Sequence, residues 1–120
     1  MHKIIIDTDP GQDDAVAILT ALASPEDFEV LGICTVAGNV PLNLTTHNAL
    51  QLVELAGSDV KVYSGCSRPM AKDLVTAEYV HGPTGLDGAD LPPPTRTAEE
   101  QHAVEFIIAT LRAAEPLSVT

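Results

Sequence analysis

Four carboxylates stand within eight positions near the start of the chain: Asp7, Asp9, Asp13 and Asp14. Two like charges about 4 Å apart repel by roughly 4 kcal/mol near a protein surface. A turn that carries four acids therefore needs a cation, shared protons or very good solvation. Every ligand atom in the cluster is an oxygen, because no His or Cys lies between the acids. The favoured cation is hard, either Ca²⁺ or Mg²⁺.

The acids stand between a strand and a helix. Residues 3–8 contain three consecutive isoleucines, which predict a strand buried on both faces. Pro10 and Gly11 predict a turn, and the apolar run after them predicts a helix over residues 12–23. The helix dipole favours acids in a first turn. It accounts for the two acids inside the helix but not for the two that precede the proline.

The alternation of strand and helix continues along the chain. Further strands are predicted over residues 28–36 and 60–63, separated by a helix over residues 41–56 with Asn39 or Val40 near its cap. Strands that alternate with helices indicate a parallel sheet with right-handed crossovers. The expected fold class is α/β, an open and mostly parallel Rossmann-like sheet with helices on both faces.

Residues 64–96 break this alternation, because they are rich in glycine and proline and show no period. Loops of this length in a compact domain are commonly lids or binding loops, and we interpret this one as an active-site lid. Residues 97–100 read as a capping box that starts a helix ending at Ala114. Residues 117–120 predict a fourth strand. We expect residues 1–120 to be the N-terminal part of one longer domain.

The amino-acid composition excludes several classes of binding partner. The formal net charge of −11 argues against nucleic acid and anionic membrane surfaces. No stretch approaches the roughly 20 apolar residues of a membrane span, and the first residues do not read as a secretory signal. Cys34 is expected in the core and Cys66 in a loop, which is no disulfide framework. These features predict a cytoplasmic protein.

Polar residues follow each of the first three predicted strands. The aspartates follow the first, Asn39 follows the second, and the lid over residues 64–96 follows the third. Ligands in open α/β sheets bind beyond the carboxyl ends of the strands. We therefore expect these segments to converge on one rim.

Residues 7–15, Asp-Thr-Asp-Pro-Gly-Gln-Asp-Asp-Ala, resemble the DxDPGxDDA signature of the inosine–uridine-type nucleoside hydrolases. The resemblance continues in order along essentially the whole chain. It includes the second strand's exit at residues 35–39, the third strand's exit at 63–69, the lid at 81–85 and Glu115-Pro116. It implies the N-terminal portion of the nucleoside hydrolase fold.

The resemblance implies a calcium site. Asp9 corresponds to a calcium ligand that is also the catalytic general base toward the attacking water. Asp14 corresponds to a second, bidentate calcium carboxylate, and Asp7 to a support residue near the metal. The implied reaction is calcium-dependent hydrolysis of the N-glycosidic bond of ribonucleosides to free base and ribose, as in purine and pyrimidine salvage.

The implied substrate-binding residues are Asp13 and Asn39, which correspond to ribose contacts, and His81, which falls in the part of the lid that approaches the nucleobase. The family's remaining calcium ligands and its leaving-group acid come from a C-terminal half that these 120 residues do not contain. We therefore expect no measurable hydrolysis and weak calcium binding from this chain alone. The full-length protein is expected to be a homo-dimer or homo-tetramer.

Two other functions remain open from the sequence. A phosphotransferase of the haloacid-dehalogenase type also places two aspartates after an apolar strand, with Asp7 as nucleophile, Asp9 as acid/base and Mg²⁺ as the metal. Residues 10–14 are not what that family shows next. The second alternative is a non-catalytic nucleoside- or calcium-binding protein on the same scaffold.

Overall fold

The central strand β2 (Phe28–Thr35) pairs in parallel with β1 (His2–Thr8) on one side and with β3 (Val62–Ser64) on the other. The computed structural model describes all 120 residues. The pairing of β1 with β2 shifts register once, where Ile4 lies opposite Val30 and Ile5 lies opposite Gly32. β2 therefore carries one extra residue in a bulge.

The chain returns to the sheet at residues 117–120, on the free side of β1. Val119 pairs in parallel with Lys3, the Thr120 N–H donates to the Lys3 carbonyl over 3.0 Å, and the Ile5 N–H donates to the Thr120 carbonyl over 2.8 Å. The first three strands run outward from β1 and the chain then crosses to the other side of it. The strand order thus reverses at β1, which is where open α/β sheets form their ligand crevice.

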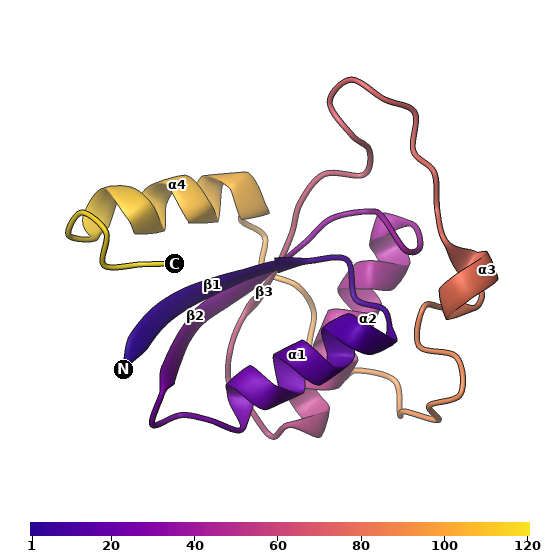
Figure 1. The fold of residues 1–120 in the computed structure, drawn as a ribbon, viewed down its shortest axis with the longest axis horizontal. Coiled ribbons are helices and arrows are strands. Elements are labelled where there is room, and N and C mark those ends of the chain that lie inside the picture. Colours follow the sequence, from indigo (N-terminus) through magenta and orange to yellow (C-terminus); the bar gives the residue numbers. More distant parts are fainter.

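Helices cover both faces of the sheet, as expected (Figure 1). α1 (Gln12–Leu22) and α2 (Leu42–Leu55) pack on one face and share a buried cluster with Ile33 and Val62. α4 (Ala103–Ala113) covers the other face. The parallel α/β architecture predicted from the sequence is confirmed.

The layer under α4 is smaller and centres on two aromatic rings. Tyr63 of β3 stacks on Phe106 of α4 with ring centroids 3.9 Å apart and planes 9° from parallel. Cys34 and Ala103 complete this cluster, so the cysteine is a core residue as predicted. A Cβ on Gly32 would lie 2.7 Å from the Phe106 ring, so glycine allows the helix to approach the strand.

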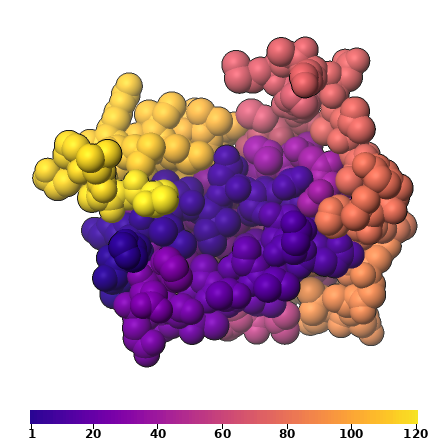
Figure 2. Space-filling view, viewed as in Figure 1, coloured from indigo at the N-terminus to yellow at the C-terminus, as the bar shows by residue number.

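The expectation that the first strand is buried on both faces is wrong for this chain. Ile4, Ile5 and Ile6 are only half-buried, and Asp7 at the strand's end is exposed. Figure 2 shows indigo atoms of this segment on the open face between the C-terminal helix and α1. Residues 117–120 reach β1 through a single bridge, which covers its edge but not its faces.

The capping box at residues 97–100 is also wrong. The Glu99 N–H donates to the Val62 carbonyl over 2.8 Å, which makes this segment a partner of β3. The helix begins at Ala103, and His102 caps it, with its Nδ1 accepting from the Val104 N–H over 3.1 Å. Pairing with the sheet takes precedence over the local cap pattern.

Smaller differences concern the ends of elements. The second helix follows Pro41, and Asn39 does not cap it. Ala56, beyond the helix end, is exposed. Residues 64–96 are largely irregular, with one short helix α3 (Glu78–His81), and the stretch around Met70 projects from the body (Figure 2). No helix in the structure is both long and apolar enough to cross a bilayer.

Candidate active site at the ends of the first two strands

Asp9 and Asn39 are joined across the ends of β1 and β2. The Asn39 main-chain N–H donates to Asp9 Oδ2 over 2.8 Å, and Asn39 Nδ2 donates to the Asp9 carbonyl over 2.8 Å. Gly38 allows this approach, because a Cβ there would overlap the Asp9 carboxylate. Asp9 Oδ1 makes no hydrogen bond within the chain, so one oxygen of this acid is held and the other remains available.

Asp14 is held from three sides. Its Oδ1 accepts from the Thr8 hydroxyl over 2.8 Å, and its Oδ2 accepts from the Gly11 N–H over 3.2 Å and from Asn39 Nδ2 over 3.3 Å. The bond to Gly11 is that of an acid capping the first turn of α1. Asp14 therefore caps a helix and, through Asn39, also lies beside Asp9.

Asp7 lies on the other side of β1, opposite Cys34 in the strand register. Asp7 is in contact with solvent, but the surrounding chain removes part of the water from its carboxyl, which raises the pKa above its ordinary value, and the negative charge of Asp9 raises it further. Burial, followed by the charge of Asp7, raises the pKa of the Cys34 thiol to about 12. Asp7 makes no hydrogen bond to Asp14 or Asn39, which places it at the margin of the site.

Asp13 and His81 differ in how they meet the site. Asp13 is exposed on the first turn of α1 and no hydrogen bond joins it to the other acids. His81, at the end of α3, does reach the signature turn. A Cβ on Gly11 would lie 2.7 Å from His81 Nδ1 and 2.8 Å from Asn39 Nδ2. The His81 ring and the Asn39 amide are therefore neighbours across Gly11.

Two residues that were not identified from the sequence connect the lid to the turn at Pro10 and Gly11. Gln12 bonds to His81, and Asn48 of α2 donates both to the Pro10 carbonyl over 3.1 Å and to the Thr84 carbonyl over 2.7 Å. Asn48 is buried on the inner face of its helix, together with Thr45, Ala49 and Leu52. An asparagine on the side of the helix that carries the apolar residues is the one sequence signal that could have identified it.

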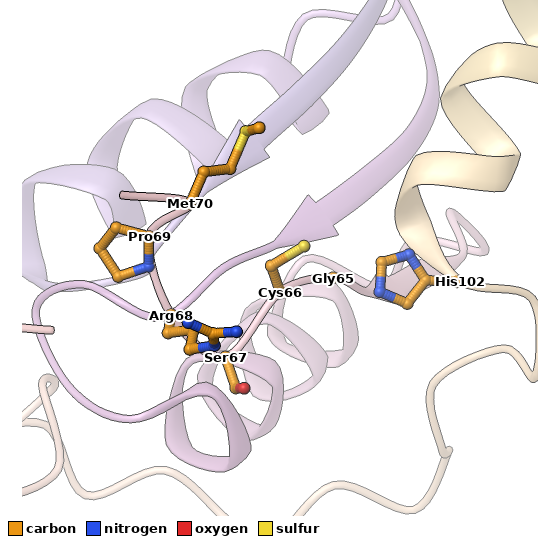
Figure 3. Close-up of a pocket in the computed structure, with 7 residues that line it drawn as sticks. All are labelled: Gly65, Cys66, Ser67, Arg68, Pro69, Met70 and His102. Atoms are coloured by element: carbon orange, nitrogen blue, oxygen red, sulfur yellow. The ribbon is translucent and has the colours of Figure 1, made fainter. Parts of the chain in front are cut away.

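A cavity of about 360 Å³ opens past the end of β3, where the chain enters the lid (Figure 3). The Ala37 N–H donates to the Cys66 carbonyl over 3.1 Å and ties the two turns together. The cavity is lined by residues from the start of the lid and by the cap residue of α4: Gly65, Cys66, Ser67, Arg68, Pro69, Met70 and His102. No cavity in the structure is lined by Asp9, Asp14 or Asn39, which form an open rim.

The donor set at this rim has the chemistry of a hard-cation site but too few ligands for a complete one. Asp9 and Asp14 offer only carboxylate oxygens, and Ca²⁺ takes six to eight oxygens. No group of three acidic, histidine or cysteine side chains in the structure is close enough together to hold a metal ion. A cation bound by these two acids would need backbone, water or substrate oxygens, or side chains from elsewhere.

Comparisons with known proteins find relatives along almost the whole chain. Residues 4–120 match the family model described as inosine-uridine preferring nucleoside hydrolase. The chain is 58% identical over 119 residues to an uncharacterized protein of Schizosaccharomyces pombe. It is 45% identical over 114 residues to the pyrimidine-specific ribonucleoside hydrolase RihB of Escherichia coli. These matches cover 98% and 95% of the chain but only 38% and 36% of the two relatives.

The fold is similar to that of solved structures. A purine-preferring ribonucleoside hydrolase from Gardnerella vaginalis superposes with a TM-score of 0.85 at 39% identity, over 92% of this chain and 36% of that one. A plant nucleoside hydrolase gives a TM-score of 0.84 at 36% identity, over 98% and 37%. The chain thus spans somewhat more than a third of the length of these relatives.

Proposed function

Because the chain belongs to the inosine-uridine preferring nucleoside hydrolase family, we propose that the protein hydrolyses the N-glycosidic bond of ribonucleosides and releases base and ribose. The observation that carries this proposal is the pairing of Asp9 and Asp14 around Asn39 at the ends of β1 and β2. The family match does not favour the phosphotransferase alternative.

Asp9 is the general base. Its Oδ2 accepts from the Asn39 main-chain N–H, which fixes the carboxylate and leaves Oδ1 to take the proton of an attacking water. The leaving base departs from an oxocarbenium-like sugar, as in glycoside hydrolysis. The negative charge at this rim stabilises the positive charge that develops on the sugar.

Asn39 binds the ribose as a hydrogen-bond acceptor. Its Nδ2 already donates to the Asp9 carbonyl and to Asp14 Oδ2, so both amide hydrogens are in use. The remaining group is Oδ1, which accepts from a sugar hydroxyl. Asp13, exposed on the first turn of α1, is a second acceptor for the sugar. His81 contacts the nucleoside from the lid, residues 64–96.

Asp9 and Asp14 are the residues that would hold Ca²⁺. When bound there, the ion would supply orientation of a water and the sugar hydroxyls and would lower the pKa of that water. Asp14 has three of its roughly four lone-pair sites in hydrogen bonds, so it is oriented before any ion arrives. Asp7 supports the site through its charge. The homo-oligomeric state expected from the family resemblance stays a prediction.

The test measures ribose released from purine and pyrimidine nucleosides by the full-length protein, its Asp9→Asn variant and the 120-residue chain. We expect the full-length protein to turn over nucleosides with calcium present, Asp9→Asn to lose at least 100-fold in kcat, and the short chain to be inactive. Asp27→Asn is the matched control, since it removes an exposed acid at the far end of β2. Full-length protein that binds nucleosides without cleaving any of them would favour the non-catalytic alternative.

A further inference from the structure

Gln12, the first residue of α1, makes two contacts with one lid residue. Its Nε2 donates to the main-chain carbonyl of His81 over 3.0 Å, and its Oε1 lies 2.6 Å from His81 Nδ1. Nε2 also points to the Asp87 carbonyl at 3.4 Å. The side chain of Gln12 is therefore placed between the signature turn and the lid.

These contacts fix which ring nitrogen of His81 carries the proton. The Gln12 amide nitrogen faces two carbonyl oxygens, so the reversed amide would set its oxygen against both of them. Oε1 must then accept, and the partner that donates to it is Nδ1–H of His81. In the neutral ring, the lone pair is consequently on Nε2.

The position of the His81 ring makes its tautomer matter for the site. His81 Nδ1 and Cε1 lie against Gly11, beside the Asn39 amide that links Asp9 and Asp14. Nε2 makes no hydrogen bond within the chain. The ring nitrogen that remains available to a ligand is therefore Nε2, which is a hydrogen-bond acceptor.

We propose that Gln12 is a positioning residue that holds His81 as its Nδ1–H tautomer, so that Nε2 is the one ring nitrogen that accepts a hydrogen bond from a bound nucleoside. The nature of the ligand rests on the proposed hydrolase function, whereas the tautomer does not. The tautomer can therefore be tested in the unliganded chain.

The experiment records long-range ¹H–¹⁵N correlations of the histidine rings at about pH 8, above the ordinary histidine pKa of about 6.5. His102 is an internal reference of the opposite kind, because its Nδ1 accepts from the Val104 N–H and its proton must be on Nε2. We expect one spectrum to show both tautomers, with Nδ1–H on His81. The variants His81→Asn and His102→Asn assign the signals.

Variants separate the role of Gln12 from general anchoring of the loop. Gln12→Ala should shift His81 toward the Nε2–H form that free imidazole side chains favour. Gln12→Glu should restore Nδ1–H in part, because it keeps an acceptor oxygen for Nδ1 but loses the donor to the two carbonyls. Gln51→Ala is the matched control, since Gln51 donates to the Leu91 and Pro92 carbonyls of the same loop without touching His81. A wild-type His81 with its proton on Nε2, or the same shift in Gln51→Ala, would overturn the proposal.

A second measurement applies to the full-length protein. For Gln12→Ala, kcat/KM should fall on the order of tenfold, the scale of one lost hydrogen bond, and Gln12→Glu should recover part of it while Gln51→Ala keeps the wild-type value. An unchanged kcat/KM in Gln12→Ala would overturn the role of Nε2 in binding the nucleoside. Absence of hydrolysis in the wild-type protein, with the tautomer as stated, would refute the proposed function alone.

Discussion

Asn39 binds Asp9 at two points, since its main-chain N–H donates to the carboxylate and its side-chain amide donates to the carbonyl, each over 2.8 Å. The two residues are 30 positions apart in the sequence, and the parallel pairing of β1 with β2 brings them together. The side-chain bonds to Asp9 and Asp14 can be removed while the main-chain bond stays.

Asn39→Ala should lower the free energy of unfolding by about 1–3 kcal/mol, because it removes side-chain hydrogen bonds to a carbonyl and to a charged acid. Urea denaturation followed by circular dichroism measures the change. Asn43→Ala, at an exposed position on the first turn of α2, is the control and should cost much less. Equal stability of Asn39→Ala and the wild type would show that these bonds contribute nothing to the fold.

Gly38→Ala should abolish stabilisation by calcium. A Cβ at Gly38 would overlap the Asp9 carboxylate and force it to move. Calcium at ten times its Kd stabilises a protein by about 1.4 kcal/mol, which thermal melting in increasing CaCl₂ detects for the wild type.

Gly57→Ala is the matched glycine control for the calcium test. Gly57 has φ +64° and an added Cβ would meet nothing within 4 Å, so the variant should be less stable overall yet keep the calcium response. The Asp27→Asn variant controls for ions that bind loosely to an acidic surface. If Gly38→Ala responds to calcium as the wild type does, Asp9 is not a ligand.

Asp7 should make stability depend on pH. Burial, followed by the charge of Asp9, raises the pKa of its carboxyl in the folded state above the ordinary value of 3.8. The unfolded chain therefore loses this proton first, and stability falls as pH rises from about 3.8 through the folded pKa. Asp7→Asn removes this contribution and should be more stable than the wild type at pH 7 but not at pH 3 or so.

The measurement for Asp7 is the difference in unfolding free energy between wild type and variant across that range. Taking the difference cancels the titration of the acids that do not interact with Asp7. Asp27→Asn, at an exposed position, should show a difference that is nearly flat with pH. A flat difference for Asp7→Asn as well would contradict the raised pKa.

The two cysteines should react very differently. Cys34 is fully buried and burial raises its pKa to about 12, whereas Cys66 is exposed in the lid. A disulfide reagent at about pH 8 should modify one thiol per native chain and two in urea, because the thiolate is the reactive form. Cys66→Ser should leave no thiol that reacts quickly in the native protein. Rapid reaction of Cys34 in that variant would mean that the layer under α4 opens readily.

The order of strands and helices could be predicted because each element has its own local pattern. Three isoleucines before Asp7 and the apolar run after Pro10 define a strand and a helix whatever surrounds them. The approach of Asn39 to Asp9 also follows from parallel topology alone. The degree of burial does not follow in this way, since it depends on what packs against the strand.

Contacts between distant segments account for the rest. Residues 97–100 match the sequence pattern of a capping box, but the Glu99 N–H donates to the Val62 carbonyl of the sheet instead. Gln12 occupies one of the two unspecified positions of the DxDPGxDDA pattern, and nothing local indicates that its amide meets His81, 69 positions away. Such contacts cannot be predicted from the sequence, because they depend on the three-dimensional position of a loop that has no local pattern.

The extra residue in β2 determines which helical layer each later side chain meets. Leu31 and Gly32 both face α4, and Ile33 then faces α1 and α2. Deleting Leu31 would therefore remove the bulge and leave a regular ladder, in which Ile33 still lies opposite Ile6 and still faces α1 and α2. A one-residue deletion between Ile33 and Thr35 has no such extra residue to absorb it, so it would turn the later side chains of β2 to the opposite layer and carry Asn39 away from its aspartate.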